Sequence, residues 1–220
     1  MILEFCLRNY LSIRNEVKIS FLATSLKESL PEPNETVSLS DTGLSLVRSA
    51  VVYGANASGK SNILKALAFF KRFITESFIN SQAGEDIDVQ PFRLNSTSLH
   101  EPTMMEATFT DGNHIYRYGF EVTSKAIVAE WLFQRACKKR AKEVELFYRE
   151  NGATNVHPQS DHIKELVAKK MIRDNALILS TAAQFNDPKA VAILQWLGNT
   201  QVIFCSEEET LWQQAIRHLD

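Results

Sequence analysis

Eight consecutive residues of this chain have the types and the spacing to bind a phosphate chain. They match the pattern G-x-x-x-x-G-K-[ST] at every fixed position, and they are Gly54, Ala55, Asn56, Ala57, Ser58, Gly59, Lys60 and Ser61. The two glycines allow backbone angles and a close approach that a side chain would prevent. The loop N–H groups and the positive end of a following helix would then point at a β-phosphate.

The last two residues of the pattern would supply the charged contacts. Lys60 would place a positive charge at the β- and γ-phosphates, and the Ser61 hydroxyl would be a ligand of Mg²⁺. The competing interpretation is a glycine turn that opens a helix and carries a solvated lysine. A strand before the loop and a helix after it would favour the phosphate loop, so the flanking sequence decides between the two.

Both flanks have the expected pattern. The apolar run LVRSAVVY, residues 46–53, predicts a strand that ends at Tyr53 and is buried on both faces. After the loop, apolar residues recur at helical spacing at Ile63, Leu67, Phe70 and Ile74, and the helix should end between Asn80 and Gly84. We therefore expect a nucleoside triphosphate site with Mg²⁺.

The rest of the chain predicts an α/β fold in three parts. Residues 1–85 hold N-terminal strands at 2–7 and 16–22, a long loop at 23–44 and the phosphate-loop core. Residues 86–152 predict an inserted antiparallel β subdomain, because VQPFRL, MMEATFT, HIYRYGFEV, AIVAEWLFQR and EVELFYRE are separated by turns such as Asp111-Gly112. Residues 153–220 predict helices, with one strand at 201–205 and a last helix from Glu207 to Asp220.

Composition excludes several classes of protein. The chain is 45% hydrophobic and 23% charged with a formal net charge of -2, which argues against a protein coated with nucleic acid. Its three cysteines show neither a disulfide framework nor zinc-ligand spacing. The longest apolar stretch, residues 63–70, is too short to span a bilayer, and Glu4 and Arg8 interrupt any signal peptide. We expect a cytoplasmic protein without a membrane partner.

The loop resembles a particular group of nucleotide-binding proteins. G-x-N-x-S-G-K-S-N, with Asn56 in the loop and Asn62 after it, is similar to ABC-type ATPases of the RecF, SMC and OLD group. The segment Asn9-Tyr10-Leu11-Ser12-Ile13 is similar to the "NFRSI" segment with which those heads begin. SAVVYGANASGKSNILKAL, PFRL and WLFQR resemble a bacterial AAA/ABC-type family that is associated with abortive infection and phage defence.

The resemblance implies ATP as the nucleotide, ATP hydrolysis, a homodimer closed through the nucleotide, and coupling to an anti-phage or DNA-related effector protein. Three departures limit what carries over. Leu11 stands where the arginine of "NFRSI" is expected, which leaves Arg8 or Arg14 to compensate or to be solvated loop charges. No Walker B motif is present, because residues 202–208 have Ser206 in the position of the aspartate. The acidic residues there also suit the first turn of a helix.

The third departure is the absence of an LSGGQ-like signature. We therefore expect the chain to be the N-terminal half of an ATPase head, truncated or split, that needs a C-terminal half in the same or a separate chain. The alternative is a scaffold or switch that holds ATP without hydrolysing it and docks a protein partner. A transporter subunit is disfavoured, since the 23–44 loop and the β insert do not resemble that class.

Two further features have weaker signals. Gln90 lies where ABC-type folds place a glutamine that touches Mg²⁺ and the attacking water, and the alternative is a polar residue at a strand end. The cluster Lys138, Lys139, Arg140 and Lys142 could contact DNA phosphates, or it is the solvated turn of a hairpin.

Overall fold

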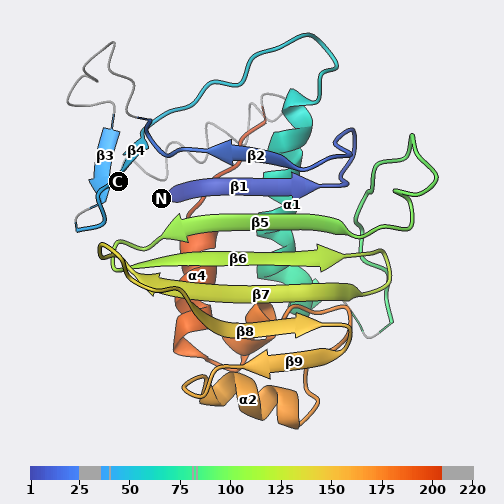
Figure 1. The fold of residues 1–220 in the computed structure, drawn as a ribbon. Coiled ribbons are helices and arrows are strands. Elements are labelled where there is room, and N and C mark those ends of the chain that lie inside the picture. The colour runs from blue at the N-terminus through green and yellow to red at the C-terminus, as the bar shows by residue number, and fades with distance from the viewer. Residues whose placement is uncertain (25–35, 40, 81, 83, 205–220) are drawn as a thin grey trace, which may run out of the picture.

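A computed structural model describes residues 1–24, 36–39, 41–80, 82 and 84–204 of the chain. The described elements comprise nine strands and four helices: β1 (Ile2–Arg8), β2 (Val17–Ser20), β3 (Thr36–Leu39), β4 (Leu44–Val47), α1 (Lys60–Asn80), β5 (Thr103–Thr110), β6 (His114–Val122), β7 (Ile127–Ala136), β8 (Val144–Glu150), β9 (Ala153–Val156), α2 (Asp161–Ala168), α3 (Ile178–Gln184) and α4 (Pro188–Gly198). The fold is mixed α/β, as the sequence predicts (Figure 1).

One antiparallel sheet of seven strands forms the larger layer, in the order β2-β1-β5-β6-β7-β8-β9. The predicted Asp111-Gly112 hairpin is confirmed between β5 and β6, where the Asp111 carboxylate accepts hydrogen bonds from the N–H groups of Asn113 and His114. The N-terminal strands join the same sheet, because β1 pairs with β5 and Phe5 lies opposite Ala107. The strands before and after residue 86 thus form one sheet, and the division at 1–85, 86–152 and 153–220 stays a prediction.

Several predicted elements differ from the structure. Residues 36–39 form a strand inside the segment predicted to be a loop, and residues 89–94 form no strand. Residues 153–156 add β9 to the sheet, although the sequence places this stretch in the helical part. Residues 201–204 are not in a strand, while Cys205 and the expected helix at 207–220 lie outside the described residues.

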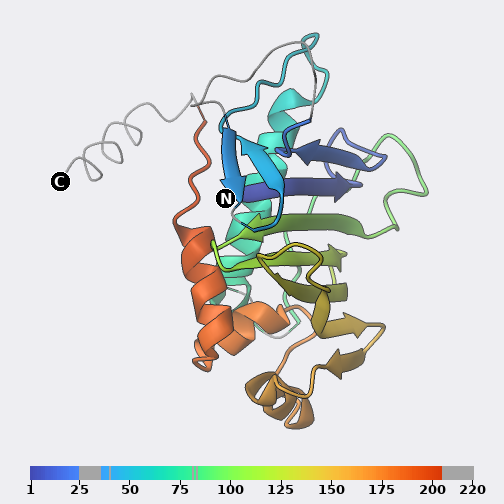
Figure 2. The same cartoon turned by 60° about the vertical axis from the view of Figure 1, so that its left-hand side comes forward.

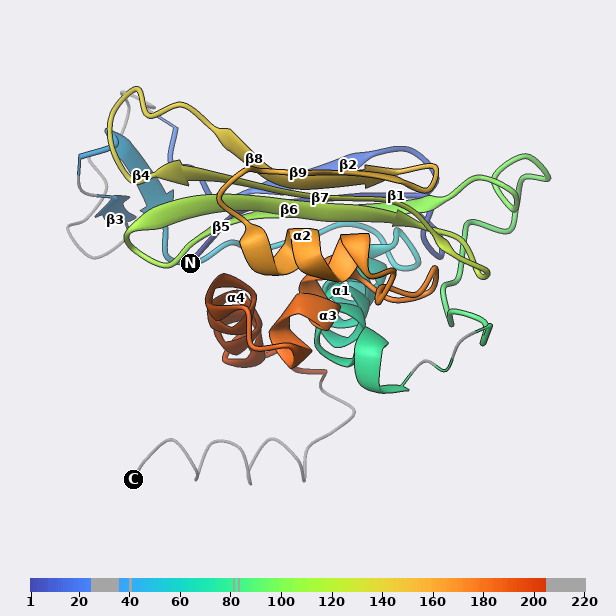
Figure 3. The same ribbon diagram turned by 90° about the horizontal axis from the view of Figure 1, so that it is seen from below.

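All four helices cover the same face of the sheet, as Figures 2 and 3 show. The alternation of each strand sends one set of side chains into this layer. Phe70 of α1 stands at the centre, with its ring 5.6 Å from Phe5 and 5.5 Å from Phe120. Trp196 of α4 stacks on Phe109 at 4.4 Å. The two contacts of Phe70 fix the axis of α1, and with it the place where the helix begins.

The buried carboxylate of Glu130 joins the start of α3 to the sheet. Glu130 of β7 is fully buried and accepts hydrogen bonds from the Tyr118 hydroxyl at 2.9 Å and from Arg149 at 3.0 Å. It also accepts from the N–H groups of Ile178 and Leu179 at the start of α3, at 2.7 and 3.1 Å. Burial raises the pKa of Glu130, whereas Arg149 and the two amides lower it. Every lone pair direction of this carboxylate is thereby engaged.

Replacing this carboxylate should destabilise the fold. Glu130→Gln keeps the size of the side chain but leaves the Arg149 charge buried without a counter-ion, so we expect the free energy of unfolding to fall by about 3–5 kcal/mol in denaturant titration. Asp86→Asn is the matched control, because its ion pair with Lys125 is exposed and should contribute less than about 1 kcal/mol. Equal losses in the two variants would show that the Glu130 network is not what holds α3.

Candidate functional site

The predicted phosphate loop lies exposed between β4 and α1, above β2 in the view of Figure 1. Helix α1, predicted to follow the loop, begins at Lys60, the penultimate residue of the pattern. Two positive backbone angles bend the loop, φ 62° at Ala57 and φ 95° at Gly59. Glycine suits the second position, because residues that carry a side chain rarely adopt such a positive φ. The loop therefore has an exposed main chain leading directly into a helix N-terminus.

The Lys60 side chain folds back over the loop. Its ammonium group donates to the carbonyl oxygens of Gly54 at 2.8 Å and of Ala55 at 2.7 Å. The first turn of α1 holds no acidic residue, so nothing there competes for this cation. These two hydrogen bonds close residues 54–61 into a ring. Lys60 is the only positively charged side chain of the ring, and it points across it. An anion entering the ring would meet the ammonium group and the free N–H groups of the helix start.

The strand predicted before the loop is wrong as stated. β4 ends at Val47, and Val51, Val52 and Tyr53 are 84%, 52% and 91% exposed. No main-chain hydrogen bond within the described residues involves 49–53, so the segment has no neighbouring strand there. The physical reason is pairing: an apolar run becomes a buried strand only where adjacent strands satisfy its N–H and C=O groups. Here the apolar residues that lead into the loop remain in solvent.

The turn at residues 9–14 connects the loop to the sheet. Ser12 accepts a hydrogen bond from the Asn62 side chain at 2.7 Å, and a Cβ added at Gly59 would lie 3.0 Å from the Ser12 hydroxyl oxygen. The same turn reaches Gln90, whose main-chain oxygen accepts from the N–H of Leu11 at 2.9 Å. Ser12 is thus a neighbour of the loop that no pattern in the sequence assigns to it. The only signal for it is its place in the Asn9–Ile13 segment.

Asn9 holds this turn in place. It is 1% exposed, its side-chain amide donates to the carbonyl oxygens of Ser98 and Glu101, and its side-chain oxygen accepts from the N–H of Phe92. Asn9 also has a positive φ of 56°, a conformation that asparagine tolerates better than most residues. This residue therefore fixes the segment after Gln90 against the end of β1.

The other candidate residues do not converge on the loop. Gln90 is exposed and reaches the loop through the 9–14 turn, but no side-chain contact joins it to Ser61. Arg8 forms an ion pair with Glu121 at 2.8 Å, so it is engaged on the sheet, whereas Arg14 is exposed. Within the described residues no group of three His, Cys, Asp or Glu side chains could hold a metal ion. The acidic part of residues 202–208 lies outside the described residues.

An apolar hollow of about 350 Å³ adjoins the loop. Lys60 and Ser61 stand at its edge, and its walls come from β1, β2, α1 and the unpaired segment, with Phe5, Phe21 and Val52 among them. Leu64 of α1, which also lines it, is 46% exposed. The hollow therefore continues the exposed apolar surface of residues 51–53 towards the sheet.

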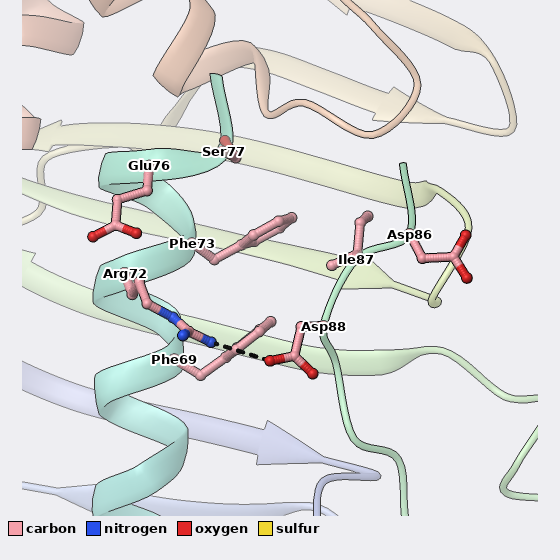
Figure 4. Close-up of a pocket in the computed structure, with 8 residues that line it drawn as sticks. All are labelled: Phe69, Arg72, Phe73, Glu76, Ser77, Asp86, Ile87 and Asp88. Carbon is pink, nitrogen blue, oxygen red and sulfur yellow. Dashed lines mark ion pairs between the residues drawn. The ribbon is translucent and has the colours of Figure 1, made fainter. Parts of the chain in front are cut away.

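A smaller pocket of about 210 Å³ lies further along α1, between that helix and residues 86–88 (Figure 4). Phe69, Phe73 and Ile87 line it, and Arg72 reaches across to Asp88 at 3.8 Å. Asp86 points away towards Lys125, which binds both of its oxygens at 2.7 and 2.8 Å. These two acidic residues already have cationic partners, so we do not assign the pocket a ligand.

The contact between Gly59 and Ser12 predicts that the loop is sensitive to a single methyl group. In Gly59→Ala the positive φ should cost about 1–2 kcal/mol of unfolding free energy, and the added Cβ would push against Ser12 and distort the ring. Gly84→Ala shares the positive φ, but a Cβ there meets nothing within 4 Å. We expect similar stability losses in thermal unfolding and weakened nucleotide binding only in Gly59→Ala. Unchanged nucleotide affinity in Gly59→Ala would contradict this geometry.

None of the described helices has the length and apolar character needed to cross a membrane.

Among curated proteins, none matches this sequence. One protein family does match, over residues 49–184, which begins just before the phosphate loop and ends with α3; its description is "AAA domain, putative AbiEii toxin, Type IV TA system". Because the match covers more than half of the 220 residues, the chain belongs to this family of AAA-domain proteins of the abortive-infection type.

Proposed function

We propose that the chain binds ATP with Mg²⁺ at residues 54–62 and forms part of an ABC-type ATPase head. The observation that carries the proposal is the ring closed by Lys60, whose ammonium group now rests on the carbonyl oxygens of Gly54 and Ala55. A triphosphate would offer that group charged oxygens, which make stronger hydrogen bonds than neutral carbonyls. Lys60 would therefore exchange its partners inside the loop for the β- and γ-phosphates.

The other residues of the site would have separate tasks. The N–H groups between Asn56 and Ser61 would hold the β-phosphate at the positive end of α1. The exposed Ser61 hydroxyl would hold Mg²⁺ on this loop, and the ion would neutralise part of the phosphate charge. Ser12 and Asn62 would keep the start of the helix in register with β1. The exposed Gln90 side chain, which the hydrogen bond between Leu11 and the Gln90 main chain places beside the 9–14 turn, would be the second contact of Mg²⁺.

ATP hydrolysis needs groups that the described residues do not bring to the loop. A carboxylate must orient or deprotonate the attacking water, and a second one usually supports the metal ion. We propose that a C-terminal ATPase half, in the same or a separate chain, supplies them. The unpaired segment at residues 49–53 supports this, because its free main-chain groups and its exposed side chains at Val51, Val52 and Tyr53 suit the addition of neighbouring strands.

The apolar hollow next to this segment fits the same partner. Strands added beside residues 49–53 would cover Val52 and Leu64 and would bring their ends to the level of Lys60 and Ser61. Once complete, such heads would close as a homodimer around the nucleotide, and closure would signal to an effector protein in defence against phage. The abortive-infection description of the family is the support for that context.

A second candidate function is a nucleotide-gated scaffold that holds ATP without hydrolysing it. It is favoured by one observation, namely that within the described residues the loop has a cation and a hydroxyl but no adjacent cluster of carboxylates. Restoring a C-terminal half distinguishes the two functions, since turnover that depends on a carboxylate of that half would reject the scaffold.

Nucleotide binding should depend on one ammonium group. Lys60→Ala removes a charge-assisted contact, which is worth about 1.5–3 kcal/mol, so the affinity for Mg-ATP should fall more than about tenfold in isothermal titration calorimetry. Lys65→Ala is the matched control, because Lys65 lies exposed on the same helix and has no partner among the described residues. Absence of any Lys60-dependent heat would overturn the proposal.

Turnover by the 220-residue chain alone should be slow even when Mg-ATP is bound. Phosphate release measured at saturating ATP should stay near the uncatalysed rate, and amides 50–53 should exchange with deuterium much faster than those of 66–74 in α1. Rapid hydrolysis that Lys60→Ala abolishes would mean that the catalytic carboxylate is already present. Protected amides at 50–53 would mean that the segment already has a strand partner.

A further inference from the structure

A basic hollow of about 410 Å³ lies at the end of β7 and β8, where the hairpin between them meets the start of α4. Arg135, Lys142 and Lys189 line it together with His114 and His157. In Figure 1 this hairpin projects from the left end of the sheet, whereas α1 begins at the top. The hollow is therefore separate from the phosphate loop, and the proposed nucleotide site does not use it.

The hairpin that borders the hollow carries unpartnered cations. Lys138, Lys139, Arg140 and Lys142 are exposed, and Arg140 has a positive φ of 60° that turns the chain tightly. Within the described part of the chain, neither these four side chains nor that of Arg135 makes a hydrogen bond or an ion pair. By contrast, Arg117 in the neighbouring strand is bound by two carboxylates. Five positive charges thus accumulate within eight residues of a chain whose net charge is -2.

Carboxylates close to the hairpin are engaged by other groups of the protein. Asp111 accepts from the N–H groups of Asn113 and His114 and lies 3.9 Å from the His114 ring nitrogen. Both oxygens of Glu143 accept from Arg117, at 3.2 and 2.7 Å, and Glu145 accepts from the side-chain amide of Asn155 at 2.6 Å. Asp187 caps α4 by accepting from the N–H of Ala190 at 2.9 Å. These carboxylates are each satisfied by a donor of the protein, so they are not the partners of the hairpin cations.

Lys189 at the start of α4 contributes one further positive charge to the lining of the hollow. Its ammonium group donates to the side-chain oxygen of Gln134 at 2.6 Å, and although the residue is exposed, partial desolvation lowers its pKa against the opposing effect of Asp187. A bound anion would favour the charged form of the lysine. The polar lining therefore consists of two lysines and one arginine, which can only donate, and of two histidines and two glutamines. His157 accepts from the N–H of Gln159 through Nδ1, and His114 lies 3.9 Å from Asp111.

We propose that this hairpin and the hollow beside it bind the phosphate backbone of a nucleic-acid duplex without reading its bases. Successive cations on a projecting turn match a ligand that carries a negative charge every ~1.7 Å along its axis. The lining contains no Phe, Tyr or Trp, so it lacks the stacking surface with which proteins hold single strands. An acidic peptide would need an apolar anchor as well, and the hollow offers only Val144, Leu146 and two alanines.

The test is fluorescence anisotropy of a labelled DNA duplex with the full 220-residue chain across a series of NaCl concentrations. The variant Lys138→Gln/Lys139→Gln/Arg140→Gln/Lys142→Gln should bind at least about tenfold more weakly at low salt. The slope of log K against log[NaCl] should fall by about 1 for each phosphate that the variant no longer neutralises. The control Lys125→Gln/Lys164→Gln/Lys169→Gln/Lys170→Gln removes the same charge elsewhere and should bind as the unmodified chain does. Circular dichroism would verify that both variants are folded.

Three further binding measurements distinguish a duplex from other ligands and from the nucleotide site. Lys60→Ala should leave duplex binding unchanged, so failure of the ATP proposal and failure of this one are distinguishable. Tighter binding of the matched single strand would contradict the choice of a duplex, and equal competition by poly-glutamate would assign the surface to an acidic protein instead. Absence of duplex binding at low salt, or equal weakening in the control variant, would overturn the proposal.

Discussion

The packing of α1 against the sheet is the constraint on which the candidate site depends. Phe70 contacts rings of β1 and β6, and Phe73 lies 5.3 Å from Phe120, so the helix is held at its centre by aromatic residues. A helix of 21 residues is about 30 Å long, and its first turn reaches beyond this anchor to the edge of the sheet near β2. The position of Lys60 follows from that geometry, whatever conformation the loop takes.

The loop itself is fixed from one side only. On the side of the helix, Ser12 and Asn62 link it to the end of β1, and Asn9 secures that link to the segment after Gln90. On the other side, residues 49–53 lead into the loop without a strand partner among the described residues. Such an arrangement leaves the first half of the ring free to adjust when an anion or a neighbouring strand arrives. It also leaves apolar side chains in water, which is costly unless a partner covers them.

Much of this fold is visible in the sequence because local patterns determine it. The spacing of Ile63, Leu67, Phe70 and Ile74 predicts α1 with nearly its observed bounds, and Asp111-Gly112 predicts the β5–β6 hairpin. The predicted strand segments MMEATFT, HIYRYGFEV, AIVAEWLFQR and EVELFYRE likewise coincide with β5 to β8 within about one residue. The wrong predictions concern tertiary partners: an apolar run at 51–53 does not reveal whether strands lie beside it.

The same limit applies to the polar contacts. Nothing in the local sequence marks Glu130 as the buried carboxylate that receives two amides of α3, or Ser12 as a neighbour of Gly59. These pairs are distant in the chain and meet only through the sheet order. The basic hairpin shows the converse case, because its charges are plain in the sequence, whereas the hollow beside it requires β6, α4 and residue 157 to be placed together.

A crystal structure of the chain with Mg²⁺ and a non-hydrolysable ATP analogue would show directly whether the loop holds a triphosphate. We expect the Lys60 ammonium group to leave the carbonyl oxygens of Gly54 and Ala55 and to bind the β- and γ-phosphates, with the metal ion at Ser61. An analogue bound elsewhere, with Lys60 still on the two carbonyl oxygens, would contradict it.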